Sequence, residues 1–156
     1  MQIKNTAAKR KAGNASALKI GIVVSNYYAD TITGKLLLGA QAVLKEWKVS
    51  PKNITVVHVP GCFEIPYGCI TLLEREKFDA LITLGCIVGG ETDHDKYIAF
   101  AVSQGIMDLM RDYKVPIAFG ILTVDNLTQA EARSTGENNK GIEAAVAALE
   151  AAFSKK

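Results

Sequence analysis

The sequence predicts a three-layer α/β fold, in which one four-stranded parallel sheet lies between two layers of helices. Short β-branched runs alternate four times with segments whose apolar residues recur at helical spacing. The connections are only a few residues long, and right-handed crossovers between parallel strands then place helices on both faces of the sheet. The 156 residues, 49% of them apolar and 22% charged, are enough for one folded domain of this kind.

The elements can be followed in order along the chain. The first strand is the β-branched run at 18–24, and it leads into a helix that begins near Asp30 or Thr31 and stops before Pro51. The same signals predict strands at 54–59, 80–88 and 116–122, a helix from Pro66, a helix led by Thr92 or Asp93, a short helix at 128–133 and a longer one at 138–153. This order is typical of a flavodoxin-like sandwich.

Charge and composition divide the chain into two predicted parts. Residues 1–17 are expected to form a basic, flexible N-terminal arm, because four of the first eleven residues are basic and a run of small residues follows. Residues 18–156 are expected to form the α/β domain. The net charge of +2 favours neither a nucleic-acid partner nor a membrane partner.

The cysteines and the hydropathy pattern indicate a cytoplasmic protein. Cys62, Cys69 and Cys86 are odd in number and form no CxxC pair, which is typical of reduced thiols. No apolar run approaches the ~20 residues that a membrane helix needs, and no secretory signal is visible.

Parallel α/β sheets bind ligands beyond the carboxyl ends of their strands, so the candidate site lies in the loops at 25–30, 60–64, 85–94 and 123–126. A planar ligand can lie between the rings of Tyr27 and Phe63, with Glu64 as a hydrogen-bond partner. A plainer interpretation is also open: Phe63 belongs to the core, Glu64 is a favourable charge at a helix start, and Tyr28 covers the end of the sheet.

The third loop, GGETDHD at 89–95, is the most unusual. Two glycines before a helix N-terminus favour a seat for phosphate or carboxylate, with His94 as a proton shuttle. Three carboxylates in the same loop oppose an anion, so a cation must come from elsewhere. The alternatives are a solvated acidic turn, or a hard-cation site made by Glu91, Asp93, Asp95 and His94.

Two cations further along the chain, Arg133 and Lys140, lie close to the C-terminal helices. Arginine matches a phosphate group through two parallel hydrogen bonds. Considered singly, an arginine is more often a solvated surface residue, so both interpretations are open.

Six ordered blocks of the sequence together resemble the lumazine synthases, over residues 18–153. The blocks are GIVV at 21–24, VPGCFEIP at 59–66, LGCIVGGETDH at 84–94, PIAFGILT at 116–123, QAEAR at 129–133 and NKG at 139–141. The second and third blocks are each specific, and the ordered set is far more specific than any one of them.

The resemblance implies a transferase without cofactor or metal that condenses 5-amino-6-(D-ribitylamino)uracil with 3,4-dihydroxy-2-butanone 4-phosphate, the penultimate step of riboflavin biosynthesis. It implies His94 and Arg133 as catalytic residues, and substrate contacts from Tyr27, Cys62, Phe63, Glu64, Cys86, Ile87, Val88, Glu91, Thr92, Phe119 and Lys140. It also implies homopentamers, free or in sixty-subunit shells, in which the adjacent chain contributes Phe119 and Arg133, with Lys140 nearby.

The chain departs from the family pattern at three places. The first loop is one residue longer than usual, so Tyr28 can also take the stacking place. Gly89 stands where many members have an arginine, and the stretch from Arg133 to Lys140 is one residue shorter, which leaves the free pentamer and the shell both open. The competing functions are a flavin-binding module that is not an enzyme and a metal-dependent hydrolase that uses the acidic third loop.

Overall fold

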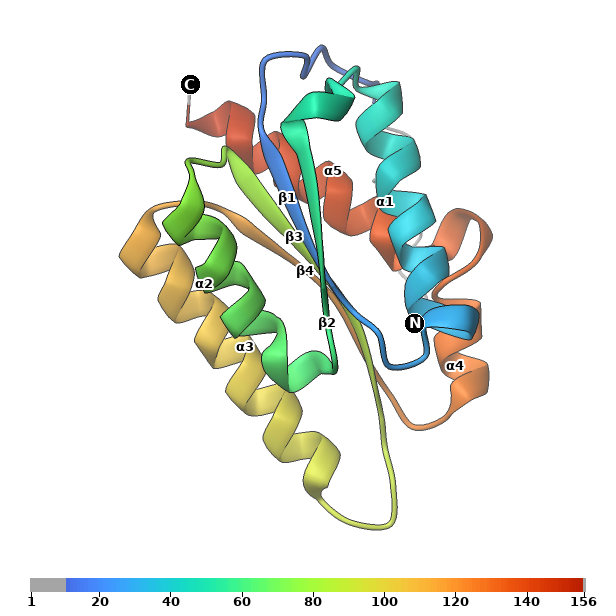
Figure 1. The fold of residues 1–156 in the computed structure, drawn as a ribbon. Coiled ribbons are helices and arrows are strands. Elements are labelled where there is room, and N and C mark those ends of the chain that lie inside the picture. Colours follow the sequence, from blue (N-terminus) through green and yellow to red (C-terminus); the bar gives the residue numbers. More distant parts are fainter. Residues whose placement is uncertain (1–10, 156) are drawn as a thin grey trace.

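The computed structural model describes residues 11–155, which form one sheet with helices on both faces (Figure 1). The strands are β1 (Ile20–Ser25), β2 (Ile54–Val59), β3 (Ala80–Val88) and β4 (Ile117–Val124). The helices are α1 (Gly34–Glu46), α2 (Ile65–Arg75), α3 (His94–Tyr113), α4 (Leu127–Ala132) and α5 (Lys140–Ser154). A π-helical turn, η2 (Ala29–Thr33), precedes α1.

The sheet is parallel throughout, with the strand order β2-β1-β3-β4. Helices α2 and α3 cover one face, and α1 and α5 cover the other (Figure 1), which confirms the predicted three-layer sandwich. Because the strands are parallel, their carboxyl ends lie at one edge of the sheet. β2 and β4 are the outer strands of this order, so each has one side that no strand of the described chain pairs with.

Apolar side chains fill both spaces between the sheet and its helices. Ile22 and Leu149 are buried on the side of α1 and α5, and Val23 and Ile106 are buried on the side of α2 and α3. Ile22 and Val23 pack on opposite faces because successive side chains of a strand alternate. The buried sheet therefore gives the loops at its carboxyl ends a rigid support.

The predicted elements agree with the structure most closely for β2 and β3, whose bounds are as predicted. β1 begins two residues later than predicted, since the Lys19 N–H donates to the Asp79 carboxylate at 2.7 Å and not to a neighbouring strand. The first helix differs in kind at its start, where the π-helical turn η2 precedes the regular α1.

The predicted N-terminal arm falls only partly within the described residues, because residues 1–10 lie outside them. Of the remaining part, Ala15 is buried, and its N–H donates to the Trp47 carbonyl at 2.7 Å. The boundary of the arm at residue 17 stays a prediction. No helix within residues 11–155 combines the length and the apolar character needed to cross a bilayer.

Candidate active site

The first two loops lie side by side at the carboxyl ends of β1 and β2. The Asn26 N–H donates to the Val59 carbonyl at 2.8 Å, and the Tyr27 N–H donates to the Pro60 carbonyl at 3.2 Å. The side chains of Tyr27 and Phe63 are 66% and 61% exposed, so Phe63 is not a core residue. Two aromatic rings are thus available to a planar ligand at this end of the sheet.

The two adjacent tyrosines have different environments. Tyr28 is half-buried and packs against the core cluster on the side of α1 and α5. Its ring meets the ring of Tyr27 edge-on, with the centroids 5.3 Å apart and the planes at 77°. Only Tyr27 presents most of its ring to solvent, and Tyr28 covers the end of the sheet.

The second loop is held by its own polar groups. Glu64 accepts a hydrogen bond from the Gly61 N–H at 3.0 Å, so part of its carboxylate serves the loop, as the plainer interpretation expected. The Cys62 thiol points at the Cys86 carbonyl, 3.6 Å away, and so links this loop to β3. Burial raises the pKa of Cys62 and of Cys86 to about 11, which keeps both thiols neutral near pH 7.

The third loop runs from the end of β3, where Cys86 and Ile87 are buried and Val88 half-buried, to the start of α3. It projects below the sheet in Figure 1 and is tied to β4 by a hydrogen bond from the Gly89 N–H to the Val124 carbonyl, 2.7 Å. Glu91, Thr92 and His94 are exposed, and His94 is the first residue of the 20-residue helix α3.

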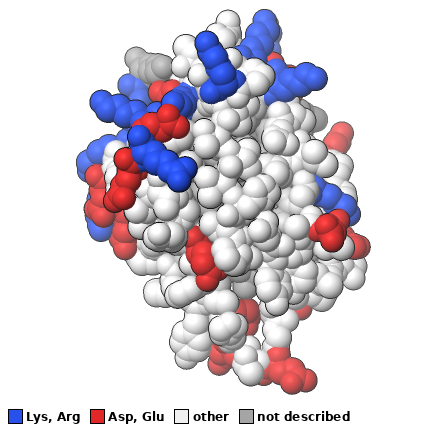
Figure 2. All heavy atoms as spheres, in the orientation of Figure 1, with Lys and Arg blue, Asp and Glu red and all other residues white. Residues whose placement is uncertain are grey.

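The charge of the third loop is mainly negative. The basic side chain nearest to it, Lys96, forms an ion pair with Asp93 at 2.7 Å. On the face shown in Figure 2, the lower end of the molecule is white and red, with no Lys or Arg visible. Residues 11–155 contain no group of three or more His, Cys, Asp or Glu that could hold a metal ion, so the hard-cation alternative gains no support.

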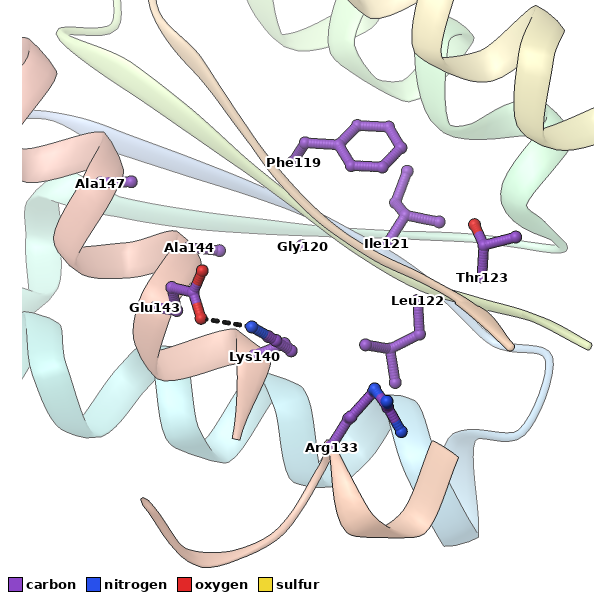
Figure 3. Close-up of a pocket in the computed structure, with 10 residues that line it drawn as sticks. All are labelled: Phe119, Gly120, Ile121, Leu122, Thr123, Arg133, Lys140, Glu143, Ala144 and Ala147. Atoms are coloured by element: carbon purple, nitrogen blue, oxygen red, sulfur yellow. Dashed lines mark hydrogen bonds and ion pairs between the residues drawn. The ribbon is translucent and has the colours of Figure 1, made fainter. Parts of the chain in front are cut away.

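A pocket of about 330 Å³ lies at the outer side of β4 (Figure 3). Phe119 projects to the side of α2 and α3, whereas Arg133 and Lys140 lie on the side of α5. Lys140 forms an ion pair with Glu143, 2.6 Å from Nζ to Oε2. One guanidinium nitrogen of Arg133 donates to the Gln129 carbonyl at 3.1 Å. The pocket is therefore lined by two cations and one carboxylate, with the Phe119 ring beside them.

The connection between α4 and α5 sets the distance between the two cations. The Lys140 N–H donates to the Arg133 carbonyl at 2.8 Å. Buried Asn139 caps α5 by accepting from the Gly141 N–H, and it donates to the carbonyls of Lys35 and Ser134, each at 2.9 Å. A Cβ at Gly141 would lie 1.9 Å from the Leu36 carbonyl oxygen, so α1 and α5 approach closely only with glycine there.

The predicted site residues thus form two separate sets within one chain. We call Tyr27, Phe63, Glu64 and His94 the strand-tip group, and Phe119, Arg133, Lys140 and Glu143 the edge group. Phe119 pairs with Thr83, and Thr83 lies five residues before Val88 at the end of β3. At the usual rise of about 3.3 Å per residue, this places Phe119 roughly 16 Å along the sheet from the tip of β3, which leads to His94. Tyr27 and Phe63 follow β1 and β2, which lie two and three strands away from β4, about 10 and 14 Å across the sheet at the usual strand spacing of about 4.8 Å.

Two polar pairs beside the predicted residues were not anticipated from the sequence. Glu143 follows Lys140 at the i,i+3 spacing of a helix, which is the signal that could have found it. His58, on β2, has an exposed side chain, and its Nδ1 lies 3.0 Å from Asn26 Oδ1. No local pattern connects residues 26 and 58, since the strand pairing brings them together.

The family model and the curated relatives give one family. The family model for 6,7-dimethyl-8-ribityllumazine synthase matches residues 17–156. A 6,7-dimethyl-8-ribityllumazine synthase of Parabacteroides distasonis is 46% identical over 137 residues, which are 87% of this chain and 85% of the relative. One of Porphyromonas gingivalis is 47% identical over 136 residues, 86% of this chain and 84% of the relative. A de novo designed Rossmann fold protein has 15% identity and a TM-score of 0.38, covering 73% of this chain and 91% of the designed one.

Proposed function

Because the chain belongs to the 6,7-dimethyl-8-ribityllumazine synthase family, we propose that two copies of it together build the site for the lumazine-forming condensation. The amine of 5-amino-6-(D-ribitylamino)uracil and the ketone of 3,4-dihydroxy-2-butanone 4-phosphate condense to 6,7-dimethyl-8-ribityllumazine, with release of phosphate and water. The chain is a transferase of riboflavin biosynthesis, and the flavin-binding and hydrolase alternatives are not favoured.

The separation of the strand-tip group from the edge group carries the proposal of a shared site. The strand-tip group offers rings for the pyrimidine and a histidine, but its third loop is acidic and its Lys96 is paired with Asp93. The edge group offers Arg133, which forms no ion pair within residues 11–155, and Lys140, which is paired with Glu143, beside Phe119. No second exposed aromatic ring lines its pocket. A second copy that places its edge group against the strand tips supplies the cations that the phosphate needs.

Such a contact joins two different surfaces, and repetition of a contact of this kind gives a ring of copies when the rotation between neighbours closes. A homopentamer, free or as the unit of a sixty-subunit shell, is the assembly that we propose. Support for a large interface comes from exposed apolar side chains on α2 and α3, namely Tyr67, Tyr97, Phe100 and Met107. Single exposed apolar residues are common on protein surfaces, but four large ones on two adjacent helices indicate a covered surface.

In the proposed complex, the pyrimidine lies between Tyr27 and Phe63. Glu64 and the backbone near Cys62 hold the ribityl chain, and the backbone of Cys86, Ile87 and Val88 borders the ring. The backbone of Glu91 and Thr92, at the positive end of the α3 dipole, receives the phosphate. Phe119, Arg133 and Lys140 of the neighbouring copy close the other side of the site.

Catalysis then depends mainly on alignment. Holding the amine beside the ketone makes a bimolecular reaction effectively unimolecular, which is the larger contribution. His94, exposed at the first turn of α3, moves protons during Schiff-base formation, loss of the phosphate group and ring closure, and such help is worth about 10²–10⁴-fold. No step requires a redox cofactor.

The test of this function is direct. Purified protein is mixed with both substrates in the presence of EDTA, lumazine fluorescence is followed, and the same sample is sedimented. We expect lumazine at an undiminished rate in EDTA, from a particle larger than one chain. A protein that binds flavin without forming lumazine would contradict the proposed enzyme, and an active monomer would contradict the shared site.

We also propose that the enzyme works in the cytoplasm. The support is chemical: Cys62, Cys69 and Cys86 are all free thiols, buried in the two halves of the core. Free thiols of this kind are typical of reducing compartments. Fractionation of the source cells, with the activity expected in the soluble extract, checks this location.

A further inference from the structure

Tyr28 has a backbone conformation that is rare for a bulky residue. Its φ of 62° and ψ of 31° lie in the left-handed region, where the Cβ atom crowds the following carbonyl. The other non-glycine residues of 11–155 with positive φ are Lys48 and Lys114. Both lysines follow the ends of helices, where a left-handed residue is a common way to stop, whereas Tyr28 stands at the start of one. Such strain persists only where the surroundings hold it.

The π-helical turn η2 holds the strained residue. The Tyr28 carbonyl accepts from the N–H groups of Thr31, Ile32 and Thr33, at 3.3, 2.8 and 3.0 Å. The turn closes at Gly34, where a Cβ would lie 2.5 Å from the Ala29 carbonyl oxygen, so glycine is needed. π-helical turns are rare and occur mostly as single turns, frequently at functional sites. The family resemblance also implies that the first loop is one residue longer than usual.

The strained turn also fixes where the Tyr27 ring lies. Hydrogen bonds to Val59 and Pro60 hold the backbone of residues 26 and 27 from the side of β2. From the other side, the half-buried Tyr28 ring meets the Tyr27 ring edge-on at 5.3 Å. This leaves the Tyr27 ring mostly exposed but supported along one side.

We propose that Tyr28 is a positioning residue, whose left-handed backbone and half-buried ring hold the Tyr27 ring ready to stack on the pyrimidine. This inference rests on the proposed stacking role of Tyr27. A ring that is already ordered loses less conformational entropy on binding, so the effect falls on affinity for the pyrimidine substrate. The phosphate substrate and the proton transfers do not involve this contact.

The test compares Tyr28→Gly with Tyr28→Phe in steady-state assays. Glycine accepts the left-handed backbone but removes the ring, whereas phenylalanine keeps the ring and removes only the hydroxyl. We expect Tyr28→Gly to raise the KM of the pyrimidine substrate about 3- to 10-fold, with the KM of the phosphate substrate and kcat changed less than about twofold. Tyr28→Phe should restore the pyrimidine KM toward that of the wild type. If Tyr28→Gly folds poorly, Tyr28→Asn, which also tolerates this conformation, serves in its place.

A double variant separates this inference from the function on which it rests. Since Tyr28 acts through Tyr27, Tyr27→Ala/Tyr28→Gly should have the same pyrimidine KM as Tyr27→Ala alone. Equal rises in both KM values for Tyr28→Gly, no rise in either, or additive effects in the double variant would each overturn the positioning role. If Tyr27→Ala itself leaves the pyrimidine KM unchanged, the proposed stacking fails, and this inference fails with it.

Discussion

The strand-tip group and the edge group consist of different kinds of side chain. The strand-tip group has two exposed rings, one carboxylate and a histidine on loops that the carboxyl ends of the strands support. The edge group has one ring on the outer strand β4, and two cations and one carboxylate from the end of α4 and the start of α5. Each group has what the other lacks for binding an aromatic substrate beside a phosphate. This difference is the reason for the proposal that the reactive unit is a contact between copies and not the single chain.

The largest effect should come from the proton-transfer residue of the strand-tip group. His94→Ala should lower kcat by about 10²–10⁴-fold, the range of general acid–base help, and leave the pyrimidine KM nearly unchanged. The matched control is His58→Ala, because His58 is also an exposed histidine, with its Nδ1 3.0 Å from Asn26 Oδ1, and has no role in the proposed proton transfers. Stopped-flow fluorescence measures the rate of lumazine formation by both variants. An equal loss of kcat in the two would contradict the proton-transfer role of His94.

The next effect belongs to the edge group. Arg133→Ala should raise the KM of the phosphate substrate by about 10- to 100-fold, since a charge-assisted contact to phosphate is lost. The pyrimidine KM should stay within about twofold. Arg111→Ala is the control, because Arg111 is an exposed arginine paired with Asp108 and Asp112 on α3. A rise in the pyrimidine KM alone would contradict the division between the two groups.

A smaller effect is expected from removal of the Tyr27 ring, which is proposed to stack on the pyrimidine. Tyr27→Ala should raise the pyrimidine KM by about tenfold, given that stacking of a base on an aromatic ring is worth about 1–3 kcal/mol. The control is Tyr113→Ala. Tyr113 is also a partly exposed tyrosine, but it lies at the C-terminal end of α3 and donates a hydrogen bond to Glu74. Titration of the pyrimidine substrate alone, followed by fluorescence, gives the affinities, and identical values for both variants would contradict the stacking.

The smallest effect concerns the buried thiol of Cys69. Burial raises the pKa of Cys69 to about 12, against an ordinary 9.0. The unfolded chain loses this proton near pH 9 while the folded chain keeps it, so the free energy of unfolding falls as pH rises from about 9 to 12.

For one thiol, the loss at pH 10 is on the order of 1 kcal/mol. Urea unfolding at pH 8 and pH 10 measures it. The Cys69→Ala variant, although less stable overall, should lose less between the two pH values than the wild type. An equal or larger loss in the variant would show that the thiol does not titrate as described.

The sequence predicts well whatever depends on burial along a single segment. The bounds of β2 and β3 follow from continuous apolar runs, and the place of His94 at the start of α3 follows from helix-start signals. The π-helical turn η2 was not predicted, because one extra residue at the start of the helix leaves its apolar spacing almost unchanged. The separation of Phe119 from the strand tips was implied only by the family resemblance and not by any local pattern, since it depends on which strand lies at the edge and on the register of β4 with β3.

Mixing two impaired variants tests the shared site most directly. His94→Ala and Arg133→Ala chains are unfolded together, refolded into mixed assemblies and assayed for lumazine at a low concentration of the phosphate substrate, at which each variant alone is nearly inactive. If each site lies between neighbouring copies, an intact site needs His94 from one copy and Arg133 from the next. In a random mixture of equal amounts of the two variants each requirement is met about half of the time, so roughly a quarter of the sites are intact. The account predicts this recovery, whereas activity no higher than the mean of the two separate variants would contradict it.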